Sequence, residues 1–217
     1  CVKAKAREDP HSRAENTRDP ETGFPVISMD YEPLEEGLTM LVVKDEDSGA
    51  VLTYDCEVKG VGDTWVLKQL VRDLEDWGRG DICLKSDGEP AMLAVLKVLS
   101  TLRTARTLPR NPPPYSPQTN GGAEKSVQDV TAHTRCLLMA LEARLKTAVT
   151  VTLPIVKWIM RHAAFLLTRY SMGHDGLTAW RRLTGKDWSG TAVEFGEVVL
   201  GKLALKRPPT AKKAKRN

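Results

Sequence analysis

Three acidic residues stand where predicted strands or helices meet loops. Asp30 lies in the first predicted strand, Asp87 just past the fourth, and Glu124 at the start of a long predicted helix. Neighbouring strands lie about 4.8 Å apart, so carboxylates on adjacent strands could share a metal ion, and an acid on a packing helix could complete the site. Mg²⁺ prefers oxygen ligands, and two ions about 3.5–4 Å apart can assist phosphodiester cleavage. Taken alone the pattern is weak, because the chain has 28 acids and a strand-end Asp is usually a turn or capping residue.

Apolar spacing predicts the elements that would position these acids. Short β-prone runs predict strands, and apolar residues at steps of three and four predict helices. The predicted strands are residues 26–31, 38–44, 50–58 and 81–86, with a short fifth over 103–108; the predicted helices are about 64–77, 90–102, 123–146, 154–170 and 177–183. Proline is unsuited to a helix interior or a central strand, so residues 109–117 should form a loop. Residues 194–205 should form a strand pair or a single extended arm.

Composition favours a globular protein in a reducing compartment. The chain has 217 residues and is 41% hydrophobic, and no apolar run approaches the roughly 20 residues of a membrane span. Its four cysteines lie far apart, which argues against a disulfide framework and against a complete zinc site. The four histidines show no spacing suited to a metal. The five tryptophans are expected to be core or interface anchors rather than base-stacking platforms.

Charge is unevenly distributed. The net charge of +4 combines a body of 25 basic and 28 acidic residues with a terminal segment, residues 198–217, that carries seven basic residues and no acid. Such a tail can bind a phosphate backbone or act as a nuclear address. A solvated terminus is the alternative.

Three motifs around the acids resemble the integrase catalytic core of retroviruses and long-terminal-repeat retrotransposons. They are SMDY at 28–31, KSDGEPA at 85–91 and YSPQTNGGAEKSVQ at 115–128. The later stretch 166–190, followed by FGEVVL at 195–200, resembles copia-type elements. The resemblance covers about residues 26–203, and its most specific part is Pro-Gln-x-x-Gly-x-x-Glu. Two departures are Gly88-Glu89, where the family usually has Asn after the second Asp, and Ala179, where it usually has Pro.

The resemblance implies an RNase H-like α/β fold, a mixed five-stranded sheet flanked by helices. Residues 25–147 would be the catalytic core, 148–190 a helical extension, and 191–217 an extended arm and basic tail. Residues 1–24 would be a linker after a missing zinc module, with Cys1 as its last ligand or simply a free thiol. Because the chain lacks an initiator Met, we expect it to be a piece of a longer protein.

The function implied is metal-dependent DNA 3′-end processing and strand transfer. Two Mg²⁺ or Mn²⁺ ions would be held by Asp30, Asp87 and Glu124. The residues expected to contact DNA are Tyr115, Ser116, Gln118, Thr119, Asn120, Lys125, Gln128, Lys212, Lys213, Lys215 and Arg216. For the residues at 115–120 the alternative is a plain turn, and for Lys125 and Gln128 it is a solvated surface.

The resemblance also implies partners and a location. The partners would be element ends, target DNA and further copies of the chain, within a larger polyprotein and with no membrane. The location would be the nucleus, or a cytoplasmic virus-like particle before import. Two rivals remain: a related transposase or nuclease, and a domesticated nucleic-acid-binding protein without catalysis.

Overall fold

The first strand occupies the centre of a mixed five-stranded sheet. The structure is a computed structural model that describes residues 17–35, 38–110, 121–150 and 152–199. The strands are β1 (Val26–Glu35), β2 (Leu38–Asp45), β3 (Val51–Cys56), β4 (Ile82–Lys85) and β5 (Thr107–Arg110). The helices are α1 (Thr64–Asp76), α2 (Pro90–Leu102), α3 (Gly121–Leu145), α4 (Pro154–Tyr170) and α5 (Ala179–Thr184). The sheet order is β3-β2-β1-β4-β5, with β1, β2 and β3 antiparallel and β4 and β5 parallel to β1. This is the architecture the sequence predicts.

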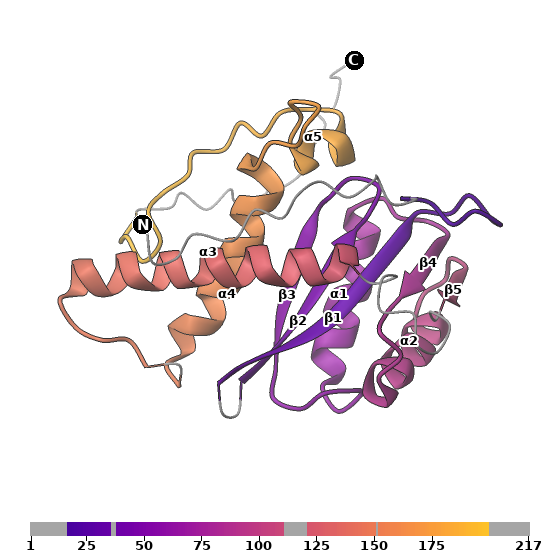
Figure 1. Cartoon of the computed structure of the whole chain (residues 1–217), viewed down its shortest axis with the longest axis horizontal. Coiled ribbons are helices and arrows are strands. Elements are labelled where there is room, and N and C mark those ends of the chain that lie inside the picture. The colour runs from indigo at the N-terminus through magenta and orange to yellow at the C-terminus, as the bar shows by residue number, and fades with distance from the viewer. Residues whose placement is uncertain (1–16, 36–37, 111–120, 151, 200–217) are drawn as a thin grey trace, which may run out of the picture.

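Each face of the sheet is covered by a different pair of helices (Figure 1). Because strand side chains alternate between faces, Ile27, Met29 and Tyr31 of β1 point to one side, where they join the core formed with α1 and α2. Met40 and Val42 of β2 belong to a second core with α3 and α4 on the opposite side. Ser28 and Asp30 alternate with the first set, so they belong to the α3 face.

The predicted helices are confirmed with small differences at their ends. The α4 bounds match the prediction, and α1 begins after Asp63, whose carboxylate accepts hydrogen bonds from the backbone N–H groups of Trp65 and Val66. α2 begins at Pro90, where a helix tolerates proline because the first-turn N–H has no partner inside the helix. None of the helices in the described ranges is both long and apolar enough to cross a bilayer.

The fifth strand lies later in the chain than predicted. It spans Thr107–Arg110, so Pro109, predicted to begin a loop, is inside a strand. Proline is tolerated there because β5 is the edge of the sheet and needs hydrogen bonds on one side only. Arg103 ends α2 instead, and its buried guanidinium donates to the carbonyls of Arg79 and Gly80. The rest of the predicted loop, residues 111–117, lies outside the described residues.

Residues 17–25, most of them expected to be linker, pack against the sheet. Asp19 is buried and forms an ion pair with Arg110 of β5 at 3.0 Å, and Arg18 bonds Asp47 at 2.8 Å. Burial acts to raise the pKa of Asp19, but hydrogen bonds from Thr22 and the pairing with Arg110 together outweigh it and lower that pKa to about 2. Ordered structure therefore extends upstream of β1, at least to residue 17.

The segment after α5 contains no strand within residues 194–199, so a strand pair is not found there. Phe195 packs against the second core, its ring 5.2 Å from that of His162, and its carbonyl accepts a hydrogen bond from Arg144 at 2.6 Å. Residues 200–205 lie outside the described residues.

Tryptophans divide between packed and exposed positions. Trp77 packs against the first core, and Trp180 and Trp188 meet edge to face at 5.1 Å. Trp65 is 53% exposed and Trp158 64% exposed, so neither is a core anchor.

Candidate active site

The pairing of β1 with β4 brings two of the predicted acids to the same level. Ser28 is paired with Lys85, the last residue of β4. Asp30 follows Ser28 by two residues in β1, and Asp87 follows Lys85 by two residues in the loop after β4, so both acids come just beyond the last pair of the two strands. Asp30 is partly buried inside β1, whereas Asp87 is exposed in the loop that follows β4.

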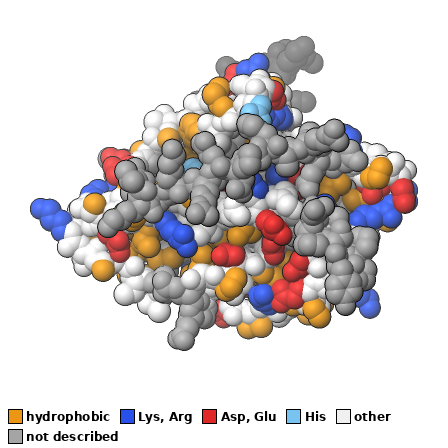
Figure 2. Space-filling model, viewed as in Figure 1, with side chains coloured by type: hydrophobic (Ala, Val, Ile, Leu, Met, Phe, Trp, Pro, Cys, Tyr) orange, Lys and Arg blue, Asp and Glu red, His pale blue; other side chains and the backbone are white. Residues whose placement is uncertain are grey.

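The third acid reaches this region from a helix. Glu124 is in the first turn of α3, and α3 packs across β1 and β2 on the face to which Asp30 belongs. Its side chain is exposed. The space-filling view of this face shows acidic side chains gathered near its middle (Figure 2). A central strand, the loop after its parallel neighbour and a helix start therefore contribute one acid each.

Burial and like charges together raise the pKa of Asp30 to about 6, from an ordinary value of 3.8. Burial is the largest cause, because it disfavours the charged form, and the charges of Asp87, Glu124 and Glu32 add to it. A hydrogen bond from the Tyr31 backbone N–H to Asp30 Oδ1, at 2.8 Å, acts in the opposite direction. Asp87 and Glu124 thus lie close enough to Asp30 for their charges to act on it.

The side chains do not form a closed ligand cluster. Across residues 17–35, 38–110, 121–150 and 152–199, no three His, Cys, Asp or Glu side chains lie close enough together to hold a metal ion. Asp87 Oδ1 instead accepts a hydrogen bond from the Glu89 backbone N–H at 3.0 Å. Carboxylate oxygens suit a hard cation such as Mg²⁺. A bound cation would also offset the repulsion between Asp30 and the nearby charges of Asp87 and Glu124.

The predicted DNA-contact residues fall into two groups. Lys125 and Gln128 are exposed on α3 just beyond Glu124, and Lys125 forms an ion pair with Asp129 at 3.2 Å. The others lie outside the described residues: Tyr115, Ser116, Gln118, Thr119, Asn120, Lys212, Lys213, Lys215 and Arg216.

The Gly88-Glu89 departure has a structural explanation. Gly88 has a φ of +86°, a left-handed conformation that glycine adopts easily and that asparagine, the usual family residue, also tolerates. The Glu89 carboxylate is held by Lys59 Nζ at 3.0 and 3.1 Å. Glu89 therefore ties the loop after β3 to the start of α2.

Three polar residues next to α3 were not candidates from the sequence. They are Ser28, Lys44 and Glu46, and they contact one another and the first turn of α3. Only Ser28 belongs to a recognised motif. Lys44 and Glu46 carried no signal, because charged residues flanking a hairpin turn are ordinarily solvated.

Solved structures of a retroviral intasome and of an integrase catalytic core have a similar fold. A chain of the simian T-cell lymphotropic virus intasome, solved in complex with PP2A regulatory subunit B56 gamma, matches with a TM-score of 0.56 and 15% identity over 86% of this chain and 67% of that one. The HTLV-2 integrase catalytic core domain, in complex with magnesium and in a trimeric form, matches with a TM-score of 0.53 and 15% identity over 72% of this chain and 93% of that one. No family model matches the sequence, and no curated protein matches it.

The chain therefore has the RNase H-like fold of retroviral integrase catalytic cores. At 15% identity the likeness establishes the fold alone. The copia-type resemblance and the roles of individual residues stay predictions.

Proposed function

We propose that this chain is the catalytic core of a DNA integrase, a polynucleotidyl transferase that processes DNA 3′ ends and joins them to target DNA. One observation carries the proposal. On an integrase-core fold, the three acids chosen from the sequence come from three different elements to one charged region, where Asp87 and Glu124 help to raise the pKa of Asp30. A divalent cation bound among these acids would offset their mutual repulsion, which supports a metal-dependent function.

The protein's part in the reaction would be to bind and to orient. Mg²⁺ or Mn²⁺, as one or two ions, would supply activation of the attacking oxygen and charge neutralisation at the phosphate. Asp30 would provide a rigid ligand from the sheet, while Asp87 and Glu124, both exposed, would turn toward it. Lys125 and Gln128, further along the same helix, would bind the DNA backbone near the reacting phosphate.

Strand transfer of a labelled DNA end tests the proposal. The wild-type chain with Mg²⁺ or Mn²⁺ is expected to give joined products, and Asp87→Asn is expected to give none at equal protein concentration. Cleavage without joining would instead indicate a nuclease. DNA binding without any chemistry would indicate a domesticated binding protein.

Partners and location rest on the same resemblance. The magnesium-bound HTLV-2 core is described in a trimeric form, and the simian virus chain is part of an intasome. By analogy we propose that this chain acts as a homo-oligomer on element ends and target DNA. Polyprotein origin, a copia-type element and nuclear or virus-like-particle location are further proposals.

The basic tail is proposed to bind DNA without sequence preference. Removing residues 198–217 is expected to flatten the salt dependence of duplex binding, since each neutralised phosphate contributes about −0.9 to the slope of log affinity against log salt. Fluorescence anisotropy with two unrelated duplexes measures both slopes. An unchanged slope after deletion would rule out this role and leave the tail a solvated terminus.

A further inference from the structure

The Glu46 carboxylate lies directly against the first turn of α3. A Cβ built on Gly122 would overlap that carboxylate, so a larger residue at position 122 would force the Glu46 side chain to move. Glu46 follows β2 in the turn before β3, and its backbone N–H donates to the Val26 carbonyl at 2.9 Å. Its side chain is 11% exposed, an unusual degree of burial for a glutamate in a hairpin turn.

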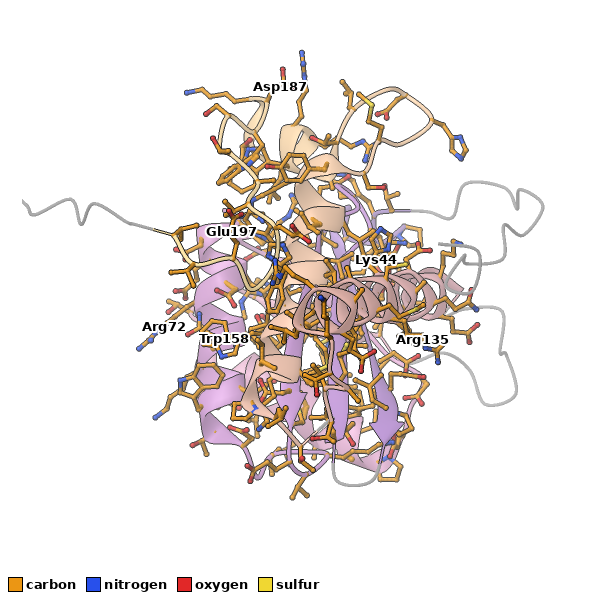
Figure 3. All side chains as sticks on the ribbon, turned by 90° about the vertical axis from the view of Figure 1, so that its left-hand side faces the viewer. Lys44, Arg72, Arg135, Trp158, Asp187 and Glu197 are labelled. Atoms are coloured by element: carbon orange, nitrogen blue, oxygen red, sulfur yellow. The ribbon has the colours of Figure 1, made fainter. Side chains whose placement is uncertain are left out.

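Two neighbours hold this carboxylate in place. Ser28, buried in β1, donates a hydrogen bond from Oγ to Glu46 Oε1. Lys44 Nζ pairs with Glu46 Oε2 at 2.7 Å and also donates to the Gly122 carbonyl at 3.3 Å. Lys44 is labelled in Figure 3. We call Ser28, Lys44 and Glu46 the α3 clamp.

The α3 clamp joins β1 and α3, two of the three elements that carry the proposed metal ligands. Ser28 is two residues before Asp30 on the same face of β1, and Gly122 is two residues before Glu124 in the same helical turn. The first turn of α3 buries only Ala123, which offers little apolar area, whereas Val127 and Val130 of the next turns join the second core. At the first turn itself, polar contacts therefore add to what little apolar packing provides. A carboxylate at a helix amino terminus also interacts favourably with the helix dipole.

We propose that Ser28, Lys44 and Glu46 are positioning residues that fix where α3 starts over β1, and thereby how closely Glu124 approaches Asp30. This inference rests on the proposed function of the three acids as metal ligands. It assigns the α3 clamp no contact with metal or DNA. Residues that orient metal ligands typically change metal affinity by roughly 10–100-fold when replaced.

The principal test compares Glu46→Gln and Lys44→Met with wild type. Each variant is expected to raise the Mn²⁺ concentration for half-saturation, measured by calorimetry, by about tenfold or more. The half-saturating Mg²⁺ concentration for strand transfer should rise similarly, with a smaller loss of rate at saturating metal. Hydrogen exchange should accelerate in residues 121–128 while α1 and α2 stay unchanged.

Two further variants separate positioning from general stability. Lys157→Met breaks a Lys–carboxylate pair with Asp55, 3.1 Å long, that links α4 to β3 away from the α3 start. It should change neither metal affinity nor exchange in residues 121–128. Gly122→Ala should weaken metal binding when Glu46 is present but have no further effect in a Glu46→Ala background, because the overlap is then gone.

The inference would be overturned if Glu46→Gln left both metal half-saturation and exchange unchanged, or if Lys157→Met reproduced its effects. Failure of the proposed function is distinguished by the wild-type titration, because the wild-type chain would then bind no Mn²⁺. In that event the hydrogen exchange of Glu46→Gln tests whether the α3 clamp docks the helix. Faster exchange confined to residues 121–128 supports docking of α3 by Glu46, and unchanged exchange overturns it.

Discussion

Asp30→Asn is expected to stabilise the metal-free protein at neutral pH while abolishing strand transfer. The pKa of Asp30 is raised to about 6 in the folded chain, so its ionisation opposes folding. The cost is fully present above pH 6, declines as the pH falls, and is absent below about pH 4, where the carboxyl group is protonated in both states. Asn removes the charge and keeps an oxygen that can accept the Tyr31 N–H.

Melting curves in EDTA measure the stability part of this prediction. At about 1.4 kcal/mol per pKa unit, the gain at pH 7.5 is at most about 3 kcal/mol. That corresponds to an increase in melting temperature of a few degrees to about 10 °C. The difference between variant and wild type should shrink as the pH is lowered to 4.

Asp30→Asn is expected to lower the rate of strand transfer even though it raises stability. Loss of a metal ligand removes several kcal/mol of transition-state stabilisation, a rate loss of roughly 10³-fold. A variant that was less stable than wild type at pH 7.5, or that retained most of its strand transfer, would contradict the role given to Asp30.

Divalent metal is expected to stabilise the wild-type chain, and Asp87→Asn to remove most of that effect. Binding to the folded state alone contributes about 2.7 kcal/mol at a hundredfold excess of metal over Kd, which raises the melting temperature by about 5–10 °C. Asp87 is exposed and contributes to the repulsion at Asp30, so its replacement removes both a ligand and a reason to bind a cation.

Asp76→Asn provides the matched control for this measurement. Asp76 is an exposed carboxylate at the end of α1, far along the chain from the proposed ligands. It should leave the metal-induced shift intact. Equal shifts in wild type and Asp87→Asn would mean that metal binds elsewhere or only nonspecifically.

Periodic apolar patterns explain why most of the fold could be predicted. The helix over Pro154–Tyr170 and the cap at Asp63 follow from local sequence, because apolar spacing and capping chemistry act within a few residues. The prediction placed the fifth strand too early because it treated Pro109 as the start of a loop. Proline is excluded only from strands that have a hydrogen-bonded neighbour on each side. The sequence alone does not show that Thr107–Arg110 has a neighbour on one side only, since that depends on the order of strands in the sheet.

Asp30, Asp87 and Glu124 were chosen from the sequence because they stand inside motifs that resemble those of integrase cores, and their role as metal ligands stays a prediction. The register that sets Ser28 opposite Lys85 emerges only from strand pairing. Contacts such as Glu46 against Gly122 and Lys59 with Glu89 join residues 76 and 30 positions apart. Such pairs leave no periodic trace in a single sequence.

Anomalous diffraction from crystals grown with Mn²⁺ tests the central claim most directly. The account predicts metal density bound by carboxylate oxygens of Asp30, Asp87 and Glu124 at roughly 2.0–2.2 Å, with any second ion about 3.5–4 Å from the first. Density elsewhere, or three carboxylates more than about 10 Å apart with α3 in place, would contradict it, because ions at that spacing could not bridge them.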